Sequence, residues 1–207
     1  MTWNFLKELF DTADRIGVID AVKRQLIKQP DPAAAQLVTV LEELSKVYAA
    51  MEDELTTYLS LFFDPSDPKQ LARERSELAS LEGGAIRARM GQARGRCSKI
   101  WNIYTRYLTP WFDRILNPKE RQDLFGLFRE LSDIDSQMVD AIEEIASWLT
   151  EEASKTGDLV EQDNFDDANE RVRIARRELR PMRERIAKAM IQIRELESDF
   201  IEISGAI

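Results

Sequence analysis

The chain has 207 residues, a formal net charge of -9 and no histidine. Without histidine, histidine-ligated metal sites and histidine-activated nucleophiles are excluded. No phosphate-binding glycine loop or Cys-x-x-Cys pair is present either. We therefore expect a non-enzymatic protein with no catalytic residues, no metal site and no cofactor, and an enzyme that uses only carboxylates or lysine stays open as an alternative. The length predicts one domain over residues 1–207.

The first predicted helix, in residues 1–17, is amphipathic. Its apolar face comprises Trp3, Leu6, Leu9, Phe10, Ala13 and Ile16. Helices that bind membrane surfaces usually carry lysine and arginine on the polar face, whereas acids predominate here. We expect this face to dock on the bundle, with membrane-surface association as an alternative.

Cytoplasmic location is expected from the same region of the chain and from the cysteine count. Neither a basic leader with an apolar core nor a run of about 18 apolar residues is present. Cys97 is the only cysteine and cannot form an internal disulfide. We expect it to be a small buried side chain rather than a reactive thiol.

Capping residues followed by proline mark three further helix starts: Asp31-Pro32, Asp67-Pro68 and Asn117-Pro118. The turn-rich stretch 154–158 supplies a fourth division. These signals predict about five main helices. Pro110 is ambiguous, because Thr109 could cap a short new helix that ends near Leu116.

Apolar residues recur at alternating steps of three and four within each segment, which places them on one stripe of a helix. Examples are Leu37 to Phe62, Ile86 to Trp111, Leu124 to Trp148 and Phe165 to Ile203. Such stripes predict an all-α, elongated, up-and-down antiparallel bundle.

The last predicted helix is long, about 40 residues or roughly 60 Å. Pro181 interrupts it without disturbing the apolar register, so we expect a kink near Leu179 rather than a helix end. One end of so long a helix could protrude and pair with a second copy of the chain.

An unusual stretch, EGGAIRARMGQARGRC at residues 82–97, concentrates glycine and arginine in this acidic chain. From Gly83 to Phe112 there are six basic residues and no acid. On a helix, the small residues form a strip nearly opposite the apolar stripe. This strip comprises Gly84, Ala88, Gly91, Gly95, Ser98 and Asn102.

Three interpretations of this strip are open. Another helix of the bundle could cover the glycines while the arginines pair with internal acids. Gly83-Gly84 could instead be a loop before a new helix. The third interpretation is a surface that binds a partner, for which the candidate residues are Arg87, Gly91, Arg94, Gly95, Lys99 and Arg106.

The leading functional hypothesis is contact with an acidic protein partner, or self-association, through this face. Nucleic-acid or anion binding is an alternative, because residues 171–194 hold nine basic and two acidic residues and could extend the basic surface. The net charge of -9 and the lack of aromatic residues among those arginines argue against nucleic acid.

Overall fold

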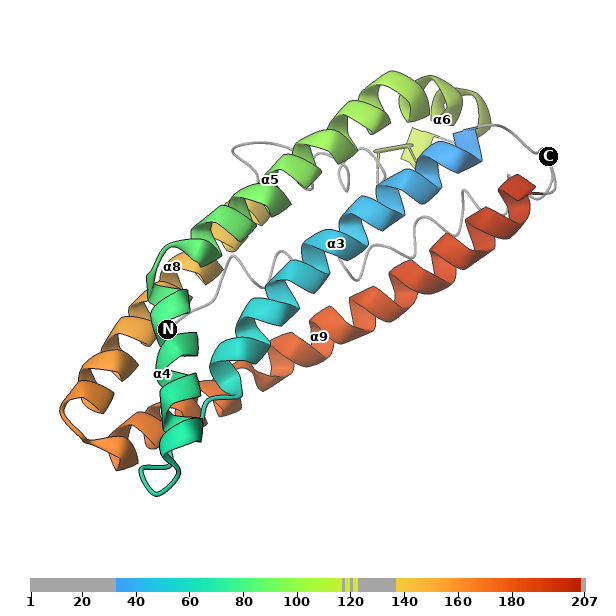
Figure 1. Cartoon of the computed structure of the whole chain (residues 1–207). Helices are drawn as coiled ribbons and strands as arrows, with labels where there is room; N and C mark the ends of the chain where they lie inside the picture. The colour runs from blue at the N-terminus through green and yellow to red at the C-terminus, as the bar shows by residue number, and fades with distance from the viewer. Residues whose placement is uncertain (1–32, 117, 120, 123–136, 206–207) are drawn as a thin grey trace.

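The computed structural model describes residues 33–116, 118–119, 121–122 and 137–205. Every regular element among these residues is helical, and the helices pack into an elongated bundle (Figure 1). The predicted all-α antiparallel bundle is confirmed. The proposed first helix, Asp31-Pro32 and Asn117 lie outside the described residues.

Helix α3 (Ala33–Leu59) lies between α5 (Ala85–Ile103) and α9 (Phe165–Gly205). It runs antiparallel to both neighbours (Figure 1). Its apolar stripe is buried from Leu37 to Tyr58, whereas Phe62 is 54% exposed. The stripe ends with the helix, because Phe62 belongs to the loop that follows Leu59.

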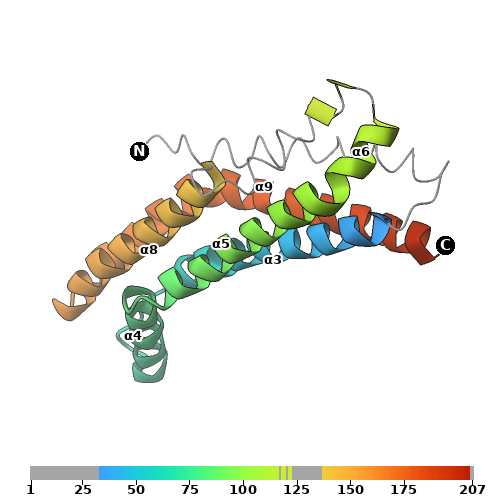
Figure 2. The same cartoon turned by 90° about the horizontal axis from the view of Figure 1, so that it is seen from above.

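The segment predicted as a third helix is divided in two. Helix α4 (Pro68–Glu82) starts as predicted, since the Asp67 carboxylate accepts hydrogen bonds from the backbone N–H groups of Lys69 and Gln70. It ends at Gly83-Gly84, where Gly84 has a φ of 80° that L side chains rarely adopt. Figure 2 shows α4 turning away from the axis of α5. The loop interpretation of these two glycines is therefore correct.

Helix α5 continues through a π-helical turn, Tyr104–Leu108, into α6 (Thr109–Ile115). Pro110 has no N–H to donate, and the wider turn lets the Thr109 N–H bond to the Tyr104 carbonyl five residues back. A short helix does begin at Thr109 and end just before Leu116, as suggested, but Thr109 does not cap it, because its hydroxyl also donates to the Tyr104 carbonyl (3.1 Å). The extra residue shifts the stripe, so Leu108 is buried and Tyr107 is 56% exposed.

Helix α8 (Gln137–Glu161) runs through the predicted turn at 154–158, so that prediction is wrong. The chain turns instead at Gln162–Asn164, before α9. Gly157 serves packing between α8 and α4, since an added Cβ would lie 2.7 Å from Oε1 of Glu82 and 3.6 Å from Cδ2 of Leu78. A glycine used for close approach has the same sequence signature as a glycine used for a turn.

Helix α9 passes through Pro181 without ending, as predicted. The residues of its predicted apolar stripe are buried from Ala168 to Phe200, whereas Ile174 and Ile191, which lie off the stripe, are exposed. None of the described helices is both long enough and apolar enough to cross a bilayer.

Candidate functional site

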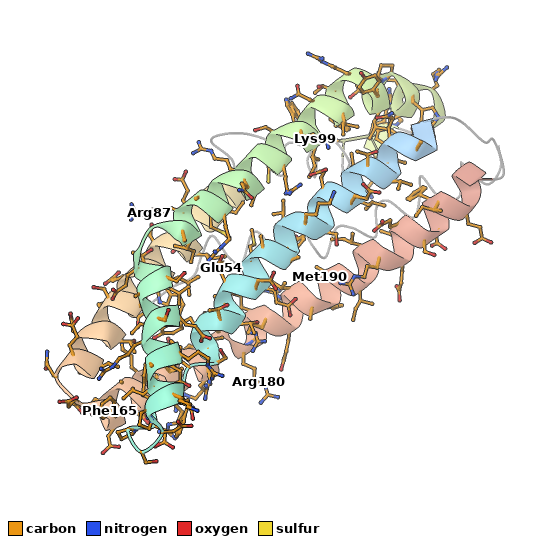
Figure 3. The ribbon with its side chains drawn as sticks, in the orientation of Figure 1. Glu54, Arg87, Lys99, Phe165, Arg180 and Met190 are labelled. Atoms are coloured by element: carbon orange, nitrogen blue, oxygen red, sulfur yellow. The ribbon has the colours of Figure 1, made fainter. Side chains whose placement is uncertain are left out.

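The basic residues of α5 fall on two flanks of the helix. Arg89, Arg96 and Lys99 reach toward α3, and Arg94 reaches toward α8. Figure 3 shows Glu54 between α3 and α5, and Arg87 pointing away from α3. The exposed small residues Gly91 and Gly95 lie between the two flanks.

On the α3 flank, two buried carboxylates are matched by these cations. Nη2 of Arg89 donates to Oε2 of Glu54 at 2.9 Å, and Glu54 is 3% exposed. Glu43, 4% exposed, accepts from Nη1 of Arg96 at 2.7 Å and from Nζ of Lys99 at 2.8 Å. These pairs fix how α5 lies along α3, so Lys99 has a structural partner within the chain.

The electrostatics of Glu43 follow from this arrangement. Burial alone raises its pKa, but the hydrogen bonds from Lys99 and Arg96 and the charge of Lys46 outweigh burial and lower the pKa to about 2. Glu43 is therefore ionised at neutral pH and neutralises cations of α5 inside the bundle.

The α8 flank is different, because its charges are only partly matched. Nη1 of Arg94 donates to Oε1 of Glu143 at 2.7 Å, and the two side chains are 41% and 59% exposed. Arg87 is exposed and makes no hydrogen bond or ion pair with any described residue. No carboxylate of the described residues neutralises Arg87, so this flank carries positive charge that the described part of the chain does not compensate.

A groove of about 380 Å³ separates α5 from α8 beside these arginines. Its lining residues are Arg87, Met90, Gly91, Arg94, Ile142, Glu143, Ala146 and Ser147. Three of the six predicted partner-binding residues, Arg87, Gly91 and Arg94, thus come together in one concave surface.

The other three predicted residues lie elsewhere on the same stretch of chain. Gly95 is exposed one turn further along α5 and does not line the groove. Lys99 belongs to the α3 flank. Arg106 lies in the π-helical turn, is exposed and pairs with no described residue.

Within the part of the chain that the structure describes, nothing covers Gly91 or Gly95. A Cβ added at either position meets nothing within 4 Å. No helix of the described residues packs over these glycines, contrary to the first interpretation. Its second half holds in part, since Arg89, Arg94, Arg96 and Lys99 do pair with acids of the same chain.

The arginines of α9 mostly serve contacts within the chain. Nη2 of Arg176 donates to the Leu61 carbonyl at 2.9 Å, and its Nε donates to the Leu59 carbonyl. Arg183 donates to the Thr56 hydroxyl at 3.1 Å, and Arg171 to Glu152 at 2.9 Å. Because α3 lies between α9 and α5, the two arginine-rich helices are not neighbours (Figure 1).

Two features matter to the site that sequence reasoning did not identify. Glu143 closes an ion pair across the groove, and Glu43 and Glu54 neutralise part of the arginine cluster. Acidic residues on helices are usually solvated, so nothing in linear order distinguishes these three. The spacing of 11 residues between Glu43 and Glu54 places both on one face of α3, but it does not indicate that this face lies against the arginines of α5.

Chemistry-bearing groups elsewhere in the described residues are dispersed. No three His, Cys, Asp or Glu residues in that part of the chain could hold a metal ion. Glu82, Glu161 and Asp163 line a groove of about 410 Å³ between α4 and α8, but all three are exposed. Cys97 is buried as expected, and burial raises the pKa of its thiol to about 12.

No protein-family model matches the chain, and no curated protein or solved structure was found to match it.

Proposed function

We propose that the protein is a non-enzymatic interaction module that binds an acidic protein segment through the exposed face of α5. The supporting observation is that Gly91 and Gly95 face open space between cationic flanks. A glycine inside a helix costs about 1 kcal/mol relative to alanine. Since no described helix packs on these two, a partner backbone approaching this face offers a reason for them.

Charge supports an acidic partner. Arg87 and Arg106 are exposed without an ion-pair partner among the described residues, and Arg94 is only partly neutralised by an exposed glutamate. Guanidinium groups bind carboxylates with paired, directional hydrogen bonds. A helix carrying several carboxylates therefore complements this surface in both shape and charge.

Binding of a synthetic helical peptide of about 20 residues, with glutamates along one face, tests this proposal; such a peptide matches α5 in length, about 30 Å. The variant is Arg87→Glu, because Arg87 has no described partner whose loss would disturb the fold. We expect affinity to fall about tenfold with unchanged helicity and melting temperature.

The matched control is Arg194→Glu, an exposed arginine of α9 with no ion pair among the described residues. It changes the net charge equally but lies on the other side of α3, so peptide affinity should stay within about twofold of the parent. Equal losses in both variants would show that only overall charge matters, and absence of peptide binding in the parent chain would refute the proposal.

A further inference from the structure

The groove between α5 and α8 has two chemically distinct parts. Its floor is apolar, formed by Met90, Ile142 and Ala146, which are 2%, 1% and 4% exposed. Its rim is charged, formed by Arg87, Arg94 and Glu143. Such a surface can bury an apolar side chain and bind carboxylates at the same time.

We propose, as an extension that rests on the proposed function, that this groove is the centre of the binding surface. Its ligand is an amphipathic acidic helix of a partner protein. One apolar residue of that helix packs on the floor. Carboxylates about one turn away on the same helix reach Arg87 and Arg94. In the free protein Glu143 forms an ion pair with Arg94. A carboxylate of the partner displaces Glu143 and pairs with Arg94 instead.

The shape of the groove favours a helix. Gly91 on the α5 side of the groove has no side chain, and Ala146 and Ser147 on the α8 side are small, so a partner backbone can come close. A volume of about 380 Å³ is enough to enclose apolar side chains and is at the lower end of the size of binding pockets. Amphipathic helices commonly dock into grooves of this kind through side chains three, four and seven residues apart.

The state of Arg94 explains why Glu143 can be exchanged. An ion pair between side chains that are 41% and 59% exposed contributes little to stability. A partner carboxylate can therefore replace Glu143 without weakening the bundle appreciably. Arg87, with no described partner, needs no exchange at all.

The test uses the full chain and a synthetic helical peptide of about 20 residues that carries one central leucine and glutamates three and four residues away. Affinity is measured by fluorescence anisotropy. Replacing the peptide leucine with alanine should weaken binding about tenfold or more, because burial of a leucine side chain on the floor is lost. Replacing the glutamates with glutamine should weaken it similarly.

Two glycine variants of the protein form a matched pair. Gly91→Leu fills the groove from α5, whereas Gly95→Leu adds the same side chain to open surface outside it. Both changes favour helix formation, so neither should unfold the chain. We expect Gly91→Leu to weaken peptide binding at least about tenfold, and Gly95→Leu, on the same face but outside the groove, to weaken it by no more than about threefold.

Glu143→Gln tests the exchange at Arg94. Removing the internal competitor should tighten peptide binding about two- to fivefold. Unchanged or weaker binding by Glu143→Gln would refute the exchange.

The outcomes separate this inference from the proposed function. If Gly91→Leu and Gly95→Leu weaken binding equally while Arg87→Glu abolishes it, the face of α5 binds acidic helices but the groove is not the centre, and the inference is wrong. Binding insensitive to the peptide leucine would also overturn it, since a charged ligand alone would then suffice. Peptide-competed self-association in sedimentation velocity would identify a second copy as the occupant and refute a separate partner.

Discussion

Individual residues of α5 have opposite effects on the fold. Arg89 and Arg96 stabilise α5 against α3 by neutralising buried carboxylates, whereas Gly91 and Gly95 weaken the helix without any described packing benefit. The glycine- and arginine-rich stretch of the sequence thus contains two groups of residues. Arg89 and Arg96 are structural, and Gly91 and Gly95 belong to the surface.

The two exposed glycines of α5, Gly91 and Gly95, are expected to lower the stability of the fold. Gly95→Ala and Gly91→Ala should each raise the free energy of unfolding by up to about 1 kcal/mol, because alanine favours the helix and its Cβ meets no neighbouring atom. Urea unfolding followed by circular dichroism measures this. Gly84→Ala is the contrasting variant: it should destabilise the chain, since Gly84 has a φ of 80°. Destabilisation by Gly95→Ala would mean that something covers this position.

The buried carboxylate of Glu43 should make the stability of the fold depend on pH. Its pKa is about 2 in the folded chain, below its usual 4.5, so ionised Glu43 stabilises the fold above pH 4.5, and this contribution is lost as pH falls toward about 2. We expect the contribution to be about 1–3 kcal/mol at neutral pH. Glu43→Gln should lower the free energy of unfolding by that amount at pH 7 and flatten its decline between pH 5 and 2.

The control for Glu43→Gln is the adjacent substitution Glu42→Gln. Glu42 is exposed and its distance to Nζ of Lys46 is 4.0 Å, so its loss should change stability by less than about 0.5 kcal/mol. Parallel pH profiles for the parent chain and Glu43→Gln would show that the charge of Glu43 is not a major source of acid sensitivity.

At the scale of elements, α9 holds the end of α3 through polar side chains. Asn169 bonds both backbone groups of Phe63, accepting from its N–H at 2.8 Å and donating to its carbonyl at 2.9 Å. Arg176 donates to the carbonyls of Leu59 and Leu61. The last carbonyls of a helix have no partner within the helix, so the bond to Leu59, the last residue of α3, supplies a cap from a residue more than 100 positions away, and the bonds to Leu61 and Phe63 hold the loop that follows.

Arg176→Ala should therefore destabilise the chain by about 1–3 kcal/mol, because charged hydrogen bonds to helix-end carbonyls are lost. Hydrogen exchange should speed up most for amides near residues 59–63. Arg177→Ala is the matched control, since Arg177 is adjacent, exposed and not hydrogen-bonded to described residues. Equal destabilisation by the two substitutions would assign the loss to the removal of a positive charge from α9 rather than to capping.

Most of the fold could be predicted from the sequence because burial follows the apolar spacing. The stripes are buried as predicted from Leu37 to Tyr58 in α3 and from Ala168 to Phe200 in α9, and the Asp67 cap lies where the sequence places it. The errors arise where one residue type serves two purposes. Gly157 permits close approach of α4 and not a turn, and the π-helical turn before Pro110 moves Tyr107 out of the core.

The site was predicted less completely, for a related reason. A helical projection correctly separates the exposed strip of Gly91 and Gly95 from the core. It says nothing about which helix lies beside α5, so the groove with Ile142 and Glu143 could not be foreseen. Pairing of Lys99 with Glu43 likewise depends on how α3 and α5 are packed.

On the scale of the whole molecule, the arrangement of charge bears on nucleic acid as an alternative ligand. A basic stripe would require the arginine-rich α5 and α9 to lie side by side, but α3 separates them (Figure 1). Several α9 arginines also donate to carbonyls or carboxylates of the chain. With a net charge of -9, most of the remaining surface repels a polyanion.

We therefore predict no appreciable binding to single-stranded RNA or duplex DNA at about 50 mM salt. Attraction between cationic side chains and phosphates is stronger at this low salt concentration than at physiological salt. Fluorescence anisotropy with labelled 20-residue oligonucleotides measures this, with the acidic peptide as the positive control in the same buffer. A protein that neutralises several phosphates releases counterions from the nucleic acid when it binds. Its affinity therefore falls steeply as the salt concentration rises. Nucleic-acid binding with such a slope, reduced by Arg87→Glu, would assign the exposed arginines of α5 to phosphates instead of carboxylates.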